Sequence, residues 1–220
     1  MDTRVLHQQA GVLSTNKLIR NTYMLLSMTL IFSAVMAAVS VAAGTGFGLG
    51  LVLDIVAIVM LWFVLPRVAN SAMALPVTFG ITGLLGFGLG PMLTHYLALP
   101  NGGELVMMAM GGTGGIFLGL SGYALTSRKD FSFIGGFLMA GMMVAILAGI
   151  GAMLFNIPAL ALGVSAMVVL LMSGLILWQT SLMVNGGETN YVMATVSLYL
   201  SILNLFTSLL HLLGVFGGDD

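Results

Sequence analysis

Seven apolar stretches, each long enough to cross a bilayer, follow one another along this chain. A transmembrane helix needs about 20 mostly apolar residues. The segments that fit are roughly 20–43, 47–66, 74–97, 104–126, 132–155, 158–184 and 190–216. Charged residues make up only 6% of the sequence, whereas soluble domains carry about 25%. Because so few charges cannot cover a surface that faces water, the sequence predicts an all-α integral membrane protein.

The segments between the apolar stretches are short and rich in glycine, proline and asparagine, which favour turns. Consecutive helices are therefore expected to be antiparallel neighbours. We expect a polar N-terminal tail over residues 1–18, a transmembrane domain over 19–216 and a short C-terminus over 217–220. The chain has no cysteine and a net charge of −1, which excludes thiolate metal sites and a nucleic-acid-binding surface. No cofactor is expected.

The basic residues predict the orientation in the membrane, because lysine and arginine collect in cytoplasmic loops. They precede span one or follow spans two and four, and they are Arg4, Lys17, Arg20, Arg67, Arg128 and Lys129. With seven spans, all six lie on one side. The N-terminus is therefore expected in the cytoplasm and the C-terminus on the outer side.

Glycines recur every three or four residues in two of the predicted spans. Span three contains Gly80, Gly83, Gly86 and Gly90, and span four contains Gly111, Gly115 and Gly119. Small residues at this spacing lie on one helix face and let the backbones of neighbouring helices approach closely. Both spans are therefore expected to have tightly packed glycine faces.

Span seven carries a line of polar residues along one side. They are Ser197, Ser201, Asn204, Ser208 and His211. The steps of four and three residues keep them on one helix face, and such groups are unfavourable in contact with hydrocarbon. The line is either a set of hydrogen bonds between helices or the wall of an ion or proton path. In both cases, span seven is expected at the centre of the bundle, surrounded by the other six.

Titratable residues suggest two further sites. Asp54 lies inside span two, and His95 and His211 lie towards the same outer side, so the three are a candidate group that senses external pH. A Gly-x-Ser-Gly sequence around Ser121, with His211 later, is typical of rhomboid-type intramembrane proteases. Ser121 lies near the inner end of its span and His211 near the outer end, roughly 15 Å apart in depth. Proton transfer between them is therefore excluded.

Four stretches resemble a known family. They are "LSTNKLIRNTYMLLSMTLIFSA" at 13–34, "LGPML" at 89–93, "TSRKDFSFIGGFLMAG" at 126–141 and "GGETNYVMATVSLYLSILNLF" at 186–206. Together they resemble the Bax inhibitor (transmembrane Bax inhibitor motif) family, especially its bacterial inner-membrane branch. The resemblance implies seven helices, with six around a central seventh.

The resemblance also implies two functions. One is a pH-sensitive calcium or proton leak, which in the family depends on two aspartates and on an arginine of span two. The matching positions here are Gln179 and Ser201, with Arg67 as the candidate arginine. Because neither Gln179 nor Ser201 ionises, the pH latch is expected to be absent. The other function, which we expect to be the main one, is non-enzymatic dampening of FtsH, a membrane-anchored ATP-dependent protease, so that membrane substrates are protected.

Overall fold

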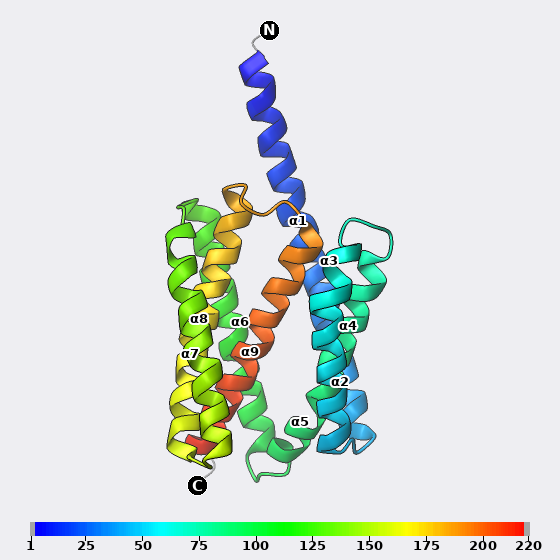
Figure 1. Ribbon diagram of the computed structural model, residues 1–220, viewed down its shortest axis with the longest axis vertical. Coiled ribbons are helices and arrows are strands. Elements are labelled where there is room, and N and C mark those ends of the chain that lie inside the picture. The colour runs from blue at the N-terminus through cyan, green and yellow to red at the C-terminus, as the bar shows by residue number, and fades with distance from the viewer. Residues whose placement is uncertain (1–2, 218–220) are drawn as a thin grey trace. The chain divides into compact units, whose positions relative to one another are not determined.

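The computed structural model describes residues 3–217, with side chains from Thr15, and its regular elements in this range are all helical. The α-helices are α1 (Thr3–Ala42), α2 (Phe47–Val59), α3 (Leu65–Val68), α4 (Ala74–Gly88), α5 (Gly90–Leu97), α6 (Gly102–Ser127), α7 (Gly135–Leu154), α8 (Pro158–Val184) and α9 (Tyr191–Gly217) (Figure 1). A π-helix, η1 (Met60–Val64), joins α2 to α3, and a 3-10 helix, η2 (Ser132–Ile134), precedes α7.

Seven helical segments are long and apolar enough to cross a membrane, which confirms the predicted all-α fold with seven spans. They are Thr15–Ala42, Phe47–Val68, Ala74–Leu97, Gly102–Ser127, Ser132–Leu154, Pro158–Val184 and Tyr191–Gly217. Helix α1 begins at Thr3, so most of the segment predicted as an N-terminal tail continues span one as helix.

The chain divides into two compact units. The first contains the residues up to Met92 together with Leu182–Tyr199, and the second contains Leu93–Ser181 with the chain from Leu200 onward. In the first unit, α4 packs against both α1 and α2. In the second, α8 contacts both α6 and α7, through the Ser121–Thr180 pair and through the close approach of Leu171 to Gly141. Helix α9 contributes its first turns to the first unit and the rest to the second.

Two prolines interrupt the regular helices of the first unit. Pro66 has no N–H, so an α-helix through it loses a backbone hydrogen bond and meets the carbonyl four residues earlier. The chain widens before Pro66 into η1, where the Leu65 N–H bonds to the carbonyl of Met60, five residues back. Pro91 likewise follows the break at Leu89 that separates α4 from α5 within span three.

The glycines of span three pack as predicted, and three of them closely approach α1. A Cβ added to Gly86 would lie 2.4 Å from the backbone oxygen of Ser33 in α1, and one on Gly83 would lie 2.7 Å from the ring of Phe32. The same prediction for span four is wrong within the described chain. Cβ atoms added at the three glycines of its repeat would meet no atom within 4 Å: Gly111, Gly115 and Gly119.

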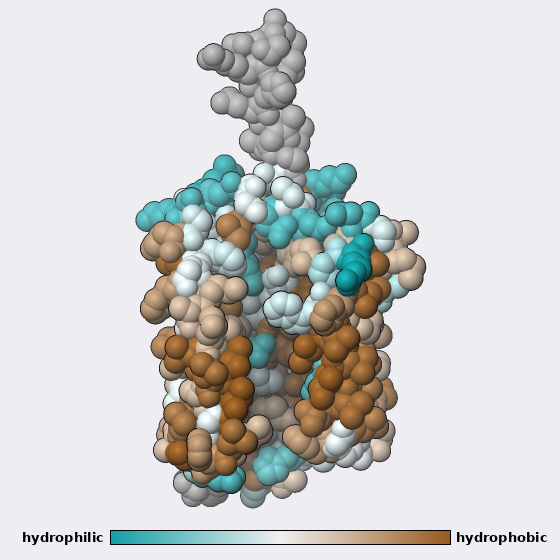
Figure 2. All heavy atoms as spheres, in the orientation of Figure 1, coloured by the Kyte–Doolittle hydropathy of each residue, from teal (hydrophilic) through white to brown (hydrophobic). Residues whose placement is uncertain are grey.

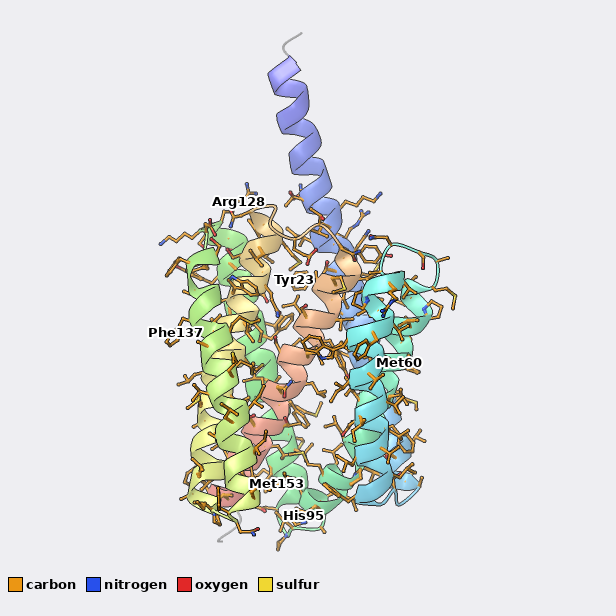
Figure 3. All side chains as sticks on the ribbon, viewed as in Figure 1. Tyr23, Met60, His95, Arg128, Phe137 and Met153 are labelled. Atoms are coloured by element: carbon orange, nitrogen blue, oxygen red, sulfur yellow. The ribbon has the colours of Figure 1, made fainter. Side chains whose placement is uncertain are left out.

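Large apolar side chains cover the outward surfaces of both units. In Figure 2 they gather over α2 and over α7, which carry exposed residues such as Ile55, Met143 and Leu147. Phe137 of α7 is 75% exposed and points away from the helices of its unit (Figure 3). Surfaces of this composition favour lipid over water.

A hydrogen-bonded loop joins α6 to α7 in the second unit. Arg128 ends α6 in the left-handed conformation, with φ of 50°. The side chain of Ser181 in α8 donates to the carbonyl of Lys129 and accepts the N–H of Phe131, at 3.0 and 2.9 Å. Asp130 accepts the N–H of Ser132, which lowers the pKa of its exposed carboxyl. The loop between the two spans is therefore fixed by α8.

Candidate functional site

The two positions that match the family's aspartate pair meet in the second unit. The hydroxyl of Ser201 in α9 lies 3.4 Å from Oε1 of Gln179 in α8, and Ser201 is buried. Two polar side chains therefore face each other where the resemblance implies two carboxyls. Neither gains or loses a proton near neutral pH. This pair therefore forms a hydrogen bond but does not change its charge with pH.

The polar line of α9 is not uniform along the helix. Ser201 and Ser208 are buried, whereas Ser197 and His211 are half-buried. Asn204 is exposed, and its amide donates to the carbonyl of Leu200 in its own helix at 2.8 Å. The structure thus gives Asn204 a partner inside α9 rather than on another helix.

His211 has its partner on α8. Its Nδ1 lies 2.7 Å from the hydroxyl of Ser165. Both side chains line a pocket of about 520 Å³ in the second unit, between the end of α7 and the start of α8. Apolar walls that include Met153 and Val164 surround this polar pair. The pocket combines one hydrogen-bonding pair with space for an apolar group.

The first unit contains a hydrogen-bond network that the sequence did not indicate. Tyr199 is fully buried, and its hydroxyl donates to the carbonyl of Thr82 at 3.1 Å. Because this uses the one phenolic proton, the hydroxyl of Ser33, 2.6 Å away, donates to the oxygen of Tyr199. The network joins α1, α4 and α9. Tyr199 lies outside the line with steps of four and three residues, and the only signal in the sequence was a tyrosine within an apolar span.

The three candidate titratable residues are divided between the units. Asp54 lies in α2 of the first unit, where its carboxyl touches Gly88 at the end of α4. His95 lies at the end of α5 in the second unit, exposed, with its ring 5.4 Å from that of Tyr96 (Figure 3). His95 and His211 therefore have different partners within their unit, and a shared pH-sensing group stays a prediction.

Arg67 and Ser121 each have a nearby hydrogen-bond partner. The guanidinium of Arg67 donates to the carbonyl of Phe63, within the same span. Ser121 lies 3.4 Å from the hydroxyl of Thr180, whereas His211 bonds to Ser165. The serine and histidine of the protease-like pattern thus have separate partners, as the depth difference predicted.

Metal-binding chemistry is limited in the part of the chain whose side chains are described. No group of three or more His, Asp or Glu side chains gathers there, which is the usual requirement for a divalent transition-metal site.

Comparison with known proteins decides the family. The family model described as "Inhibitor of apoptosis-promoting Bax1" matches residues 15–218. This chain belongs to the Bax inhibitor family. An uncharacterised membrane protein of Vibrio cholerae is 48% identical over 208 residues, covering 94% of this chain and 93% of that protein. The modulator of FtsH protease YccA from Escherichia coli K12 is 45% identical over 213 residues, covering 97% of this chain and 96% of YccA. The Bax inhibitor family expected from the sequence is therefore confirmed.

Proposed function

We propose that this multi-pass membrane protein is a non-enzymatic modulator of an FtsH-type protease, which dampens the degradation of membrane substrates. The observation that carries the proposal is the end-to-end similarity to YccA, a named modulator of FtsH, with 45% identity over 97% of this chain. The separate partners of Ser121 and His211 agree with a role that involves no nucleophilic catalysis.

The test is the lifetime of a membrane substrate of FtsH in bacteria that lack their own modulator. Expression of this chain is expected to lengthen that lifetime, and the protease is expected to co-purify with it. A substrate lifetime that stays unchanged, at an expression level equal to that of YccA in a parallel strain, would contradict the proposal.

We further propose that the protein lies in the bacterial inner membrane with its N-terminus in the cytoplasm. A reporter that is active only in the periplasm is expected to be active when fused after Asp220, because seven spans place the termini on opposite sides. The same reporter inserted after Lys129 is expected to be inactive, since that loop carries two of the basic residues. The reverse pattern would refute the orientation.

The N-terminal segment is the proposed contact with the protease. It is polar over residues 1–18, and α1 extends from span one back to Thr3. Deleting residues 2–14 is expected to leave the thermal midpoint of the purified protein unchanged while reducing protection of the substrate. Replacing the same segment with an unrelated polar helix of equal length is the control, and full protection by either variant would show that this segment is not the contact.

A second candidate function is a leak of calcium or protons through the bundle. It is favoured by the meeting of Gln179 and Ser201 at the positions of the family's aspartate pair. Since that pair carries no titratable group here, such a leak is expected to lack the family's pH gate.

A further inference from the structure

The pocket of the second unit lies where spans five and six meet, and its wall is mostly apolar. Its volume of about 520 Å³ is within the range of about 300–1,000 Å³ that is usual for small-molecule sites. Small and apolar residues of α7 and α8 form most of its lining, among them Gly149, Ala161 and Val164. Met153 also lines it and is 71% exposed on a surface that favours lipid (Figure 3). An apolar molecule in the membrane can therefore reach this pocket.

The polar pair in this pocket has a hydrogen-bond donor to spare. Nδ1 of His211 lies 2.7 Å from the hydroxyl of Ser165, and among the described side chains this is the one hydrogen bond that either residue makes. If the serine donates, the neutral imidazole carries its proton on Nε2, which is then a donor without an acceptor. If Nδ1 donates instead, the serine hydroxyl keeps a free proton. In both arrangements, one donor remains for a ligand that supplies an acceptor.

The pair lies near the depth at which a membrane lipid changes from headgroup to acyl chain. Helix α8 has 27 residues, so it is about 40 Å long, close to the thickness of a bilayer whose hydrocarbon core is about 30 Å. Ser165 comes seven residues after the start of α8, about 10 Å from that end. His211 comes six residues before the end of α9 at Gly217. The pair is thus within about 5 Å of the edge of the hydrocarbon core, where the ester groups of glycerolipids join headgroup to chain.

We propose that this pocket binds one ester-linked glycerolipid of the surrounding leaflet. An ester carbonyl accepts the spare hydrogen of the Ser165–His211 pair, and the attached acyl chain lies against apolar residues such as Met153 and Val164. An ester carbonyl has an acceptor oxygen and no hydrogen of its own, so it matches a pair that has a donor to spare. A free fatty acid would place a carboxylate at this depth, where a charge is costly. The site is separate from the proposed contact with a protease and does not depend on it.

The test compares two lipids that differ in the carbonyl alone. Purified full-length protein in detergent is titrated with a diacyl phosphatidylethanolamine or with its dialkyl ether analogue, which has the same headgroup and chain length but no ester carbonyl. Native mass spectrometry measures the affinity for the first bound lipid. The wild type is expected to bind the ester lipid about fivefold more tightly, which corresponds to the about 1 kcal/mol of one hydrogen bond.

Two variants change the site in different ways. Ser165→Ala combined with His211→Phe removes the polar pair while keeping a ring at position 211, and it is expected to bind the two lipids equally. Gly149→Leu fills the pocket that Gly149 lines. A Cβ at this position would lie 3.8 Å from the side chain of Val164, an ordinary contact, so the helices can keep their places. Gly149→Leu is expected to weaken binding of both lipids at least severalfold.

A matched double variant separates the site from general effects of losing a serine and a histidine. Ser173→Ala changes another serine of α8, whose hydroxyl donates to the carbonyl of Val169 in the same helix at 2.7 Å. His95→Phe changes an exposed histidine at the end of α5. The combination of these two replacements is expected to keep the wild-type preference for the ester lipid.

The comparison of the two lipids on the wild type is decisive by itself, so the test remains informative if a variant is less stable. Equal affinities of the wild type for the ester and ether lipids would overturn the proposal. An ester preference that survives the removal of both Ser165 and His211 would also overturn it, as would undiminished lipid binding by Gly149→Leu.

Discussion

Replacing Gly86 with alanine is expected to destabilise the protein by about 3 kcal/mol, near the upper end of the usual cost of overpacking. The new methyl group would lie 2.4 Å from the carbonyl oxygen of Ser33 and 2.8 Å from its Cα. These are backbone atoms, which cannot rotate away as the end of a long side chain can. Helix α1 would have to move from α4, and the hydrogen bond from Ser33 to Tyr199 would be strained. Unfolding in detergent, followed by circular dichroism, measures the loss.

Gly115→Ala is the matched control. A Cβ at Gly115 would meet no atom within 4 Å, and alanine is favoured over glycine within a helix by up to about 1 kcal/mol. This variant is expected to be as stable as the wild type or slightly more stable. Equal losses of stability in Gly86→Ala and Gly115→Ala would contradict the conclusion that the glycine face of span three is closely packed and that of span four is not.

The double replacement of Gln179 and Ser201 with aspartate is expected to give the protein a pH-dependent calcium flux. Their side chains already lie 3.4 Å apart, and two carboxyls at that distance cannot both ionise without a large repulsion. They would share a proton near neutral pH and separate when it is lost. In liposomes, the flux of the double variant is expected to change several-fold between about pH 6 and 8, whereas the parent changes little, because glutamine and serine do not titrate there.

The single variant Gln179→Asp is the control, since one carboxylate has no second carboxylate to repel it. Histidine also changes charge in this pH range, so His95→Gln and His211→Gln are measured in the parent background. A steep response of the parent that survives both histidine replacements would show that another group gates the protein. The interpretation that Gln179 and Ser201 replace the family's pH latch with a pair that does not titrate would then be wrong.

The number and type of the spans were predictable because each depends on a local property, the length of an apolar stretch. The partners of individual side chains were not, because they depend on which helix lies opposite. Nothing near His211 in the sequence indicates Ser165, 46 residues earlier, and nothing near Ser33 indicates Tyr199. The glycines show the same limit: spacing identifies a helix face, but only the fold decides whether another backbone covers it.

The polar line illustrates the same dependence on neighbouring helices. Periodicity grouped Ser201 and Ser208, and both are buried. It also grouped Asn204 with them, although that amide is exposed and bonds within α9. Steps of four and three residues drift around a helix of 3.6 residues per turn, and the width of the buried stripe depends on the neighbouring helices.

The π-turn before Pro66 has a consequence for how this chain aligns with its relatives. Its hydrogen bond from Leu65 to Met60 spans one residue more than an α-helical bond. A gene that loses one codon within Met60–Val64 would encode a regular turn, and the segments on either side could keep their places. The fold is therefore expected to tolerate a length difference of one residue here. Position-by-position comparison across this turn shifts by one whenever a relative lacks it. The residue that corresponds to Arg67 must therefore be assigned from the segment on the C-terminal side of the turn.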